Sequence, residues 1–278
     1  METYNDNFTY EQAMIVKHIY NDKRRCASKK RRRKALYKRM IILLLMFITF
    51  VGLGLYKAHK NGMVLGSAST DMILKNYPFS LVELYEKNPD ARNFVMDYDQ
   101  YKGKHFEIDI TDDVNEGGIP LFLQWDKRWG YEKYGSDMMA ITGCGPTSLS
   151  MVYSGLTGAT DINPYTLAKK AESEGYYVAG SGTSWNMMSD MASELGLAVY
   201  YPGNDADSIA AELSVGHPII CIMGPGDFTS SGHFIVLTAI DEDGMVTVND
   251  PNSTTNSNKK WDVNTLVPQI SGLWSYAY

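Results

Sequence analysis

The stretch TGCGPTSLS, residues 142–150, sets a cysteine between two glycines and follows them with a proline. Glycines permit backbone turns that other residues resist, and proline suits the first position of a helix. We therefore predict that Cys144 lies at a helix N-cap or just before it, with Pro146 as the first helical residue. Such an end favours the thiolate and lowers the thiol pKa. By itself the pattern is also that of a small buried side chain at a tight turn.

The residues around this stretch predict an α+β fold. Leu149, Val152 and Leu156 follow Cys144 with helical spacing. Three more helices are predicted, over 163–175 with Gly175 as the C-cap, 183–196 with a serine or threonine N-cap, and 205–216 with Asp205 as the N-cap. Strands are predicted over 197–201, 218–223, 233–240, 245–250 and 272–278. We expect an antiparallel sheet with the helices gathered on one side.

A histidine and an aspartate are expected to approach each other across a hairpin. The turn signal DEDG joins strands 233–240 and 245–250, so His233 and Asp250 come within about two residues of facing each other. A carboxylate beside an imidazole fixes its tautomer and stabilises the imidazolium. Asp250 could instead simply cap the turn NDP. His217 is the competing base, but no carboxylate stands at a comparable spacing.

A glutamine is a further candidate for the site, whereas two tryptophans and a second cysteine are expected to be structural. Gln124 is a candidate oxyanion donor, because a side-chain amide is a suitable neutral donor. Trp125 and Trp129 are expected to be structural. Cys221 lies in an apolar run and is expected to be a small core residue. With five histidines and neither CxxC nor HExxH, the sequence predicts no metal site and no cofactor.

Charge divides the chain sharply. Residues 1–39 carry a net charge of +8, residues 40–56 carry none, and the remainder carries −14. The uncharged run MIILLLMFITFVGLGLY spans about 25 Å as a helix, at the short end for a membrane span. We expect an uncleaved signal-anchor, with the basic tail in the cytoplasm and all that follows outside. A cleaved signal peptide and a buried core helix are the alternatives.

The expected organisation follows from these segments. It comprises a cytoplasmic basic tail, a transmembrane helix, a tether, a helical stalk or pro-like segment, and a catalytic domain. Their ranges are 1–39, 40–56, 57–70, 71–114 and 115–278. In the fourth segment, Leu81 and Leu84 have helical spacing, and the pair Asn88–Pro89 begins a second short helix with Phe94.

Four ordered motifs resemble the C39-like branch of papain-fold cysteine peptidases, which is common as secreted or anchored domains in Gram-positive bacteria. They are IPLFLQWDKRWGYEKYG, GCGPTSLSMVYSGLTG, GHFIVLTAID and VNDPN, and the resemblance covers roughly residues 118–278. It implies a papain-like fold, with Cys144 as nucleophile, His233 as general base and acid, Asp250 as orienting residue and Gln124 as oxyanion donor. The segment LVELYEKNPDARNFVMDY also resembles a stretch that often precedes such domains.

The resulting hypothesis is a membrane-anchored, extracytoplasmic cysteine peptidase that cleaves amide bonds in a peptide or protein. Its expected partners are that substrate and the membrane, with no nucleic acid. Two alternatives stay open. One is a hydrolase of peptidoglycan peptides, which a wall-binding module would support. The other is a noncatalytic peptide-binding domain, which has no need of all four site residues.

Overall fold

The computed structural model describes residues 74–278, and Tyr77–Tyr278 folds as one unit. The predicted basic tail (1–39), membrane span (40–56) and tether (57–70) lie outside the described residues. Among the helices of the described part, none combines the length and the apolar character needed to cross a membrane.

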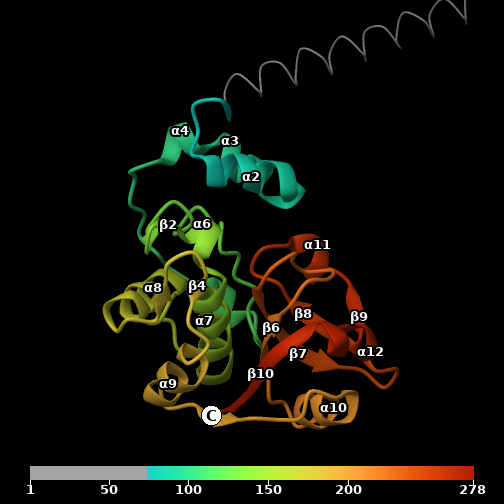
Figure 1. Cartoon of the computed structure of the whole chain (residues 1–278). Coiled ribbons are helices and arrows are strands. Elements are labelled where there is room, and N and C mark those ends of the chain that lie inside the picture. Colours follow the sequence, from blue (N-terminus) through green and yellow to red (C-terminus); the bar gives the residue numbers. More distant parts are fainter. Residues whose placement is uncertain (1–73) are drawn as a thin grey trace, which may run out of the picture. The chain divides into compact units, whose positions relative to one another are not determined.

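A six-stranded antiparallel sheet is the central element, with strands in the order β5-β10-β6-β7-β8-β9 (Figure 1). The strands are β5 (Ala198–Tyr200), β6 (Ile219–Met223), β7 (His233–Ile240), β8 (Met245–Asn249), β9 (Lys260–Asp262) and β10 (Ile270–Ala277). The predicted hairpin is confirmed, because β7 pairs with β8 and places Val236 opposite Asn249. Of these six strands, β9 is the one without a counterpart in the sequence prediction, because its three residues include one apolar side chain, Trp261, between Lys260 and Asp262.

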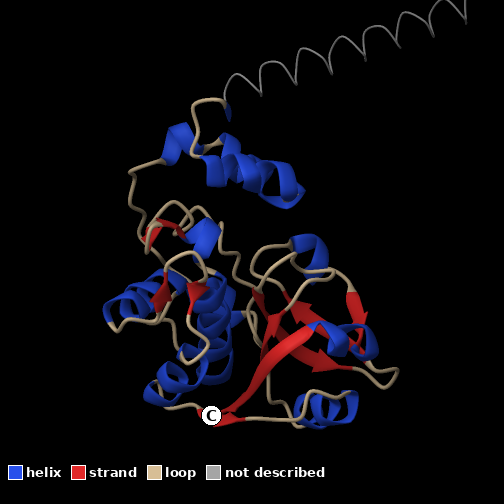
Figure 2. Ribbon diagram, viewed as in Figure 1, coloured by secondary structure: helices blue, strands red, loops and turns tan. Residues whose placement is uncertain are grey.

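Helices cover both faces of this sheet (Figure 2). Every residue of β6 is buried, with Ile220 and Ile222 in one core and Cys221 in the other. The first core contains residues of α7 (Cys144–Thr157), α8 (Pro164–Ser173) and α9 (Met187–Glu194), and the second contains residues of α10 (Ala206–Ser214) and α12 (Val263–Leu266). The prediction of helices on one side is therefore wrong. An uninterrupted apolar strand needs cover on both faces.

Cys144 is the first residue of α7 and follows the N-cap Gly143, so it lies one position inside the helix and not at the N-cap or before it, as predicted. Pro146 is the third helical residue, not the first as predicted, and its missing N–H is still no loss there because the first N–H groups of a helix have no intrahelical partner. Neither glycine has a positive φ. They provide space instead: a Cβ on Gly143 would lie 2.5 Å from a backbone oxygen, and one on Gly145 would lie 2.7 Å from the side chain of Thr183.

Two of the three predicted caps of the other helices are present. Gly175 follows α8 with φ +82°, and the side chain of Asp205 accepts a hydrogen bond from the first turn of α10. The predicted serine or threonine cap of α9 is wrong, because the helix begins after Asn186 without a side-chain cap. Thr183 belongs instead to the short strand β4 (Gly182–Thr183), which pairs with β3 (Tyr177–Val178).

Short helices precede residues 118–278, the region of the family resemblance. They are α2 (Phe79–Lys87), η1 (Pro89–Ala91), α3 (Arg92–Met96), α4 (Tyr98–Tyr101) and α5 (Thr111–Asn115). Leu81, Leu84 and Phe94 are buried, as their spacing predicts. The remaining short elements are β1 (Lys133–Tyr134), β2 (Asp137–Met138), α6 (Met139–Thr142), α11 (Thr254–Ser257) and η2 (Val267–Gln269).

Candidate active site

Cys144 and His233 line one cleft with a volume of about 700 Å³. Cys144 enters it from the N-terminus of α7, and the residue is partly exposed. His233 enters it from the start of β7, which packs against α7. The side chains of Cys144 and His233 therefore line the same cleft, at the points where α7 and β7 begin.

His233 forms a buried pair with Asp250. Its Nε2 atom lies 2.7 Å from Oδ1 of Asp250, and the side chains are 8% and 1% exposed. The pairing of β7 with β8 explains the approach, because Asp250 directly follows the last residue of β8. Since Nε2 is engaged by the carboxylate, Nδ1 is the ring nitrogen left to serve the thiol of Cys144, which lines the same cleft.

The carboxylate of Asp250 has hydrogen-bond donors on both oxygens. The backbone N–H of Asn252 donates to Oδ1 at 2.8 Å, and Nδ2 of Asn256 donates to Oδ2 at 2.8 Å. Burial would raise the pKa of Asp250, but His233 and these donors outweigh it and the pKa is lowered. Asp250 is thus held as an oriented, charged partner for the imidazole.

The surroundings shift the pKa values of the thiol and the imidazole apart. Burial would raise the pKa of Cys144, but the adjacent His233 and the backbone N–H groups of Phe234 and Gly145 bring it below its ordinary value. Burial would lower the pKa of His233, but Asp250 and Cys144 bring it well above its ordinary value. Between the two values, a thiolate–imidazolium pair is the favoured state.

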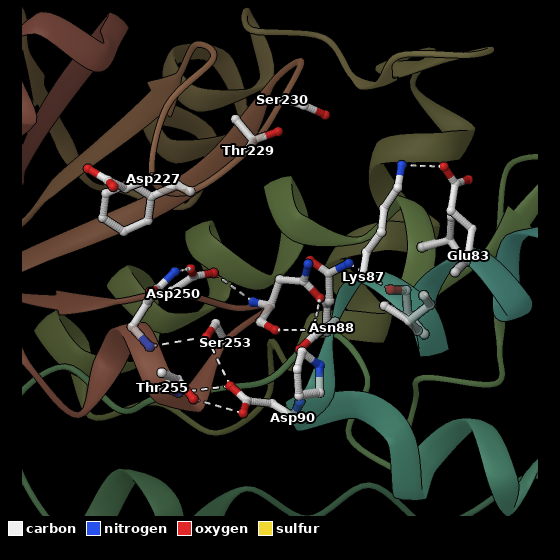
Figure 3. Close-up of a pocket in the computed structure, with 18 of the residues that line it drawn as sticks. Glu83, Lys87, Asn88, Asp90, Asp227, Thr229, Ser230, Asp250, Ser253 and Thr255 are labelled. Atoms are coloured by element: carbon white, nitrogen blue, oxygen red, sulfur yellow. Dashed lines mark hydrogen bonds and ion pairs between the residues drawn. The ribbon is translucent and has the colours of Figure 1, made fainter. Parts of the chain in front are cut away.

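Gln124 lies beside Asp250 in a neighbouring cavity of about 570 Å³, part of which is shown in Figure 3. Its backbone N–H donates to the carbonyl of Pro251 at 2.7 Å, which ties this segment to the turn after β8. Its Nε2 donates to the carbonyl of Ala140 at 2.7 Å, and within residues 74–278 its buried Oε1 has no hydrogen-bond partner. An amide nitrogen carries two hydrogens, so one N–H of Gln124 is left to donate.

Glu83 and Ile141 line both cavities, which are therefore neighbours along one surface. Gln124 is absent from the residues that line the Cys144 cleft. The structure brings together Cys144, His233 and Asp250, and it places Gln124 next to them, beside the carboxylate.

The competing residues lie elsewhere. His217 has a carboxylate partner that its sequence spacing did not suggest: Nδ1 lies 2.8 Å from Oε2 of Glu212, and the ring stacks on Tyr200. Cys221 is fully buried in the middle of β6, and burial raises the pKa of its thiol. Trp129 is fully buried, and Nε1 of Trp125 donates to the carbonyl of Asn252, so both have structural contacts.

Several residues of the site were not predicted. Asn256 belongs to the run NSTTNSN, which reads only as a polar loop, and its contact with Asp250 depends on how α11 folds. Trp185 is 48% exposed in the cleft, where its ring packs edge-on against Trp274. Thr183 lines the same cleft and hydrogen-bonds the buried Tyr134 hydroxyl. No group of three or more candidate metal ligands gathers within the described residues.

The profile of the Peptidase_C39 like family matches residues 117–277, more than half of the chain. The chain therefore has a cysteine peptidase-like fold. The chain belongs to the Peptidase_C39 like family. Curated protein sequences include no match to it.

Solved structures with some similarity include two peptidase domains and one effector. The peptidase domain of Streptococcus ComA, a bi-functional ABC transporter involved in a quorum sensing pathway, is 18% identical over 49% of this chain and 91% of its own, with a TM-score of 0.38. A double glycine motif protease from an AMS/PCAT transporter, in complex with the leader peptide, is 17% identical over 61% and 98%, with a TM-score of 0.38. The Salmonella effector SpvD is 13% identical over 76% and 99%, with a TM-score of 0.28.

Proposed function

We propose that this protein is a cysteine peptidase that hydrolyses amide bonds of a peptide or protein through Cys144, His233 and Asp250. The observation that carries the proposal is the buried pair of His233 and Asp250, with an Nε2–Oδ1 distance of 2.7 Å, in the cleft that Cys144 also lines. A nucleophile, its base and an orienting group in this order form the geometry of nucleophilic acyl transfer. A protein that only binds peptides has no need of it.

The proposed reaction has two halves. The thiolate of Cys144 attacks the carbonyl carbon of the scissile amide, and the C–N bond breaks as His233 gives its proton to the leaving amine. A water molecule then attacks the resulting thioester while His233 takes its proton, and the C–S bond breaks, which releases the acid and restores the thiolate of Cys144 beside protonated His233. The free N–H of Gln124 and the backbone N–H of Cys144 are proposed to stabilise the oxyanion in both halves.

We also propose that the domain is held outside the cytoplasm by an uncleaved membrane anchor. The sequence supports this, because the uncharged run 40–56 directly follows a strongly basic tail. Protease added to intact cells that express the full chain is expected to degrade the region after residue 56 and to protect the tail. Full protection of both regions from the protease would contradict this orientation.

The activity is tested by incubating the full chain with a peptide library and, separately, with purified peptidoglycan. Cleavage of peptides by the wild type and no cleavage by Cys144→Ala is the expected result, with Cys221→Ala as the matched control that stays active. Release of peptides from peptidoglycan alone would favour the cell-wall alternative. Binding of peptides without any cleavage would contradict catalysis and favour the noncatalytic domain.

A further inference from the structure

The short helix η1 is hydrogen-bonded, through Asp90, to the loop that follows Asp250. Oδ2 of Asp90 accepts hydrogen bonds from Oγ of Ser253 at 2.9 Å and from the backbone N–H of Thr255 at 2.8 Å. Oδ1 of Asp90 accepts from Oγ1 of Thr255 at 2.8 Å (Figure 3). One carboxylate thus holds three donors that lie more than 160 positions away in the sequence.

Ser253 and Thr255, which donate to Asp90, lie at the N-terminus of α11. The side chain of Ser253 caps this helix by accepting a hydrogen bond from the backbone N–H of Asn256 at 3.1 Å. Asn256 in turn donates to Oδ2 of Asp250, and Oγ of Ser257 accepts from the backbone N–H of Asp250 at 2.9 Å. Only α11 separates the Asp90 contacts from the contacts that hold Asp250.

A second contact beside Asp90 reaches the same carboxylate. Nδ2 of Asn88 donates to the carbonyl of Asn252 at 2.6 Å and to its Oδ1 at 3.0 Å. The backbone N–H of Asn252 donates to Oδ1 of Asp250, the oxygen that also contacts His233. Asn88 is therefore linked to Oδ1 of Asp250 through Asn252. Asp90 is linked to Oδ2 of Asp250 through the first turn of α11.

We propose that Asp90 is a positioning residue that fixes the orientation of Asp250 through α11, so that the segment Phe79–Tyr101 is a working part of the site. This inference rests on the proposed function. Glu83 of the same segment lines the cleft together with Cys144, and Cys144 is partly exposed as a residue, so the segment borders the cleft without closing it. A removable inhibitory segment would be expected to cover it.

The electrostatics of Asp90 suit this role. Burial would raise its pKa, but the hydrogen bonds from Thr255 and Ser253 outweigh it and the pKa is lowered. The side chain therefore stays ionised at neutral pH, and charged acceptors form the stronger hydrogen bonds. Removing the carboxylate leaves the N-terminal turn of α11 without three of its restraints.

The test measures the rate of iodoacetamide modification of Cys144 against pH in the full chain, with the modified peptide quantified by mass spectrometry. This rate reports the thiolate and needs no substrate. Asp90→Ala is expected to move the midpoint for Cys144 upward by about 0.5 to 1 pH unit, because a looser Asp250 stabilises the imidazolium less. Asp250→Ala is expected to move it at least as far, and Asp90→Asn, which keeps one acceptor oxygen, is expected to move it less than Asp90→Ala.

The matched control is Asp99→Ala, which removes an exposed carboxylate from the same segment and is expected to leave the midpoint unchanged. Thr255→Val removes one of the three contacts at an exposed position, so it tests the proposal even where Asp90→Ala unfolds. It is expected to give a smaller upward shift. The double variant is expected to shift no further than Asp90→Ala, as contacting residues do in a double-mutant cycle.

Two failures are distinguishable. A wild-type Cys144 that reacts like an ordinary thiol would overturn the proposed function itself. A wild-type Cys144 with a lowered midpoint that Asp90→Ala and Thr255→Val leave unmoved would overturn only the positioning role of Asp90. In that case the segment would be a spacer, and Asp250 would be held by its own loop alone.

Discussion

The N-terminus of α7 and the middle of β6 each hold a cysteine, and their surroundings shift the two thiol pKa values in opposite directions. Burial acts on both thiols and would raise both pKa values. At Cys221 nothing opposes it, because the side chain is packed among aliphatic residues. At Cys144 the imidazole of His233 and two backbone N–H groups overcome it, and the pKa falls below its ordinary value.

The difference indicates that burial alone does not decide the direction in which a thiol pKa is shifted. What matters is whether donors and a cation face the sulfur where the backbone N–H groups are free, as at the first residue of α7. In the middle of β6 every backbone group is used by the sheet, so no N–H group is free to face Cys221.

The largest change is expected from removing the imidazole. His233→Ala takes away the base and acid and the main group that lowers the Cys144 pKa. Hydrolysis of an established substrate is expected to fall by about 10³-fold, within the range for general acid–base catalysis. Modification of Cys144 by iodoacetamide at pH 6 should also slow, since the thiolate loses its partner. Unchanged modification would show that the helix end alone sets the Cys144 pKa.

A smaller change is expected from the proposed oxyanion donor. Gln124→Ala removes the remaining N–H and is expected to lower kcat by about 10²-fold, the effect of losing one such donor. Modification of Cys144 should stay at the wild-type rate, because Gln124 is absent from the groups that shift its pKa. Equal losses in both measurements would mean that Gln124 acts on the fold of the site and not on the oxyanion.

The smallest change in chemistry is expected from the second thiol. Cys221→Ala leaves a small void in a fully buried strand and is expected to lower the free energy of unfolding by about 1 kcal/mol. Denaturant unfolding measures this loss. Hydrolysis should match that of the wild type, and a loss of activity without a loss of stability would contradict the purely structural role of Cys221.

Much of this comparison could be predicted from the sequence. The apolar run PIICIM indicates the strand that holds Cys221, and the turn signal DEDG between two predicted strands indicates the hairpin that brings Asp250 to His233. These features depend on local patterns. The family motifs lie on the same elements, which is why the mixed class of helices and antiparallel sheet, and the candidates Cys144, His233 and Asp250, can be named from the sequence.

The remaining features depend on contacts between distant segments. The continuous burial of β6 meant that helices cover both faces of the sheet, which local periodicity cannot assign to particular helices. Asn256 donates a hydrogen bond to Asp250, and Ser253 donates one to Asp90. These polar residues show no sequence pattern that predicts either contact. The glycines beside Cys144 predict a turn, whereas close packing against Thr183 explains Gly145.

The most direct test of the central claim is the pH dependence of iodoacetamide modification at Cys144 in the wild-type full chain, with Cys221 as the internal reference. Because its pKa is lowered and that of His233 is raised, Cys144 is expected to hold more thiolate at neutral pH than an unperturbed thiol. The midpoint of its modification rate should therefore lie below the ordinary thiol pKa, and its rate at neutral pH should lie far above that of Cys221. A rate that climbs about tenfold per pH unit toward about pH 8.5, as for an unperturbed thiol, would contradict the account.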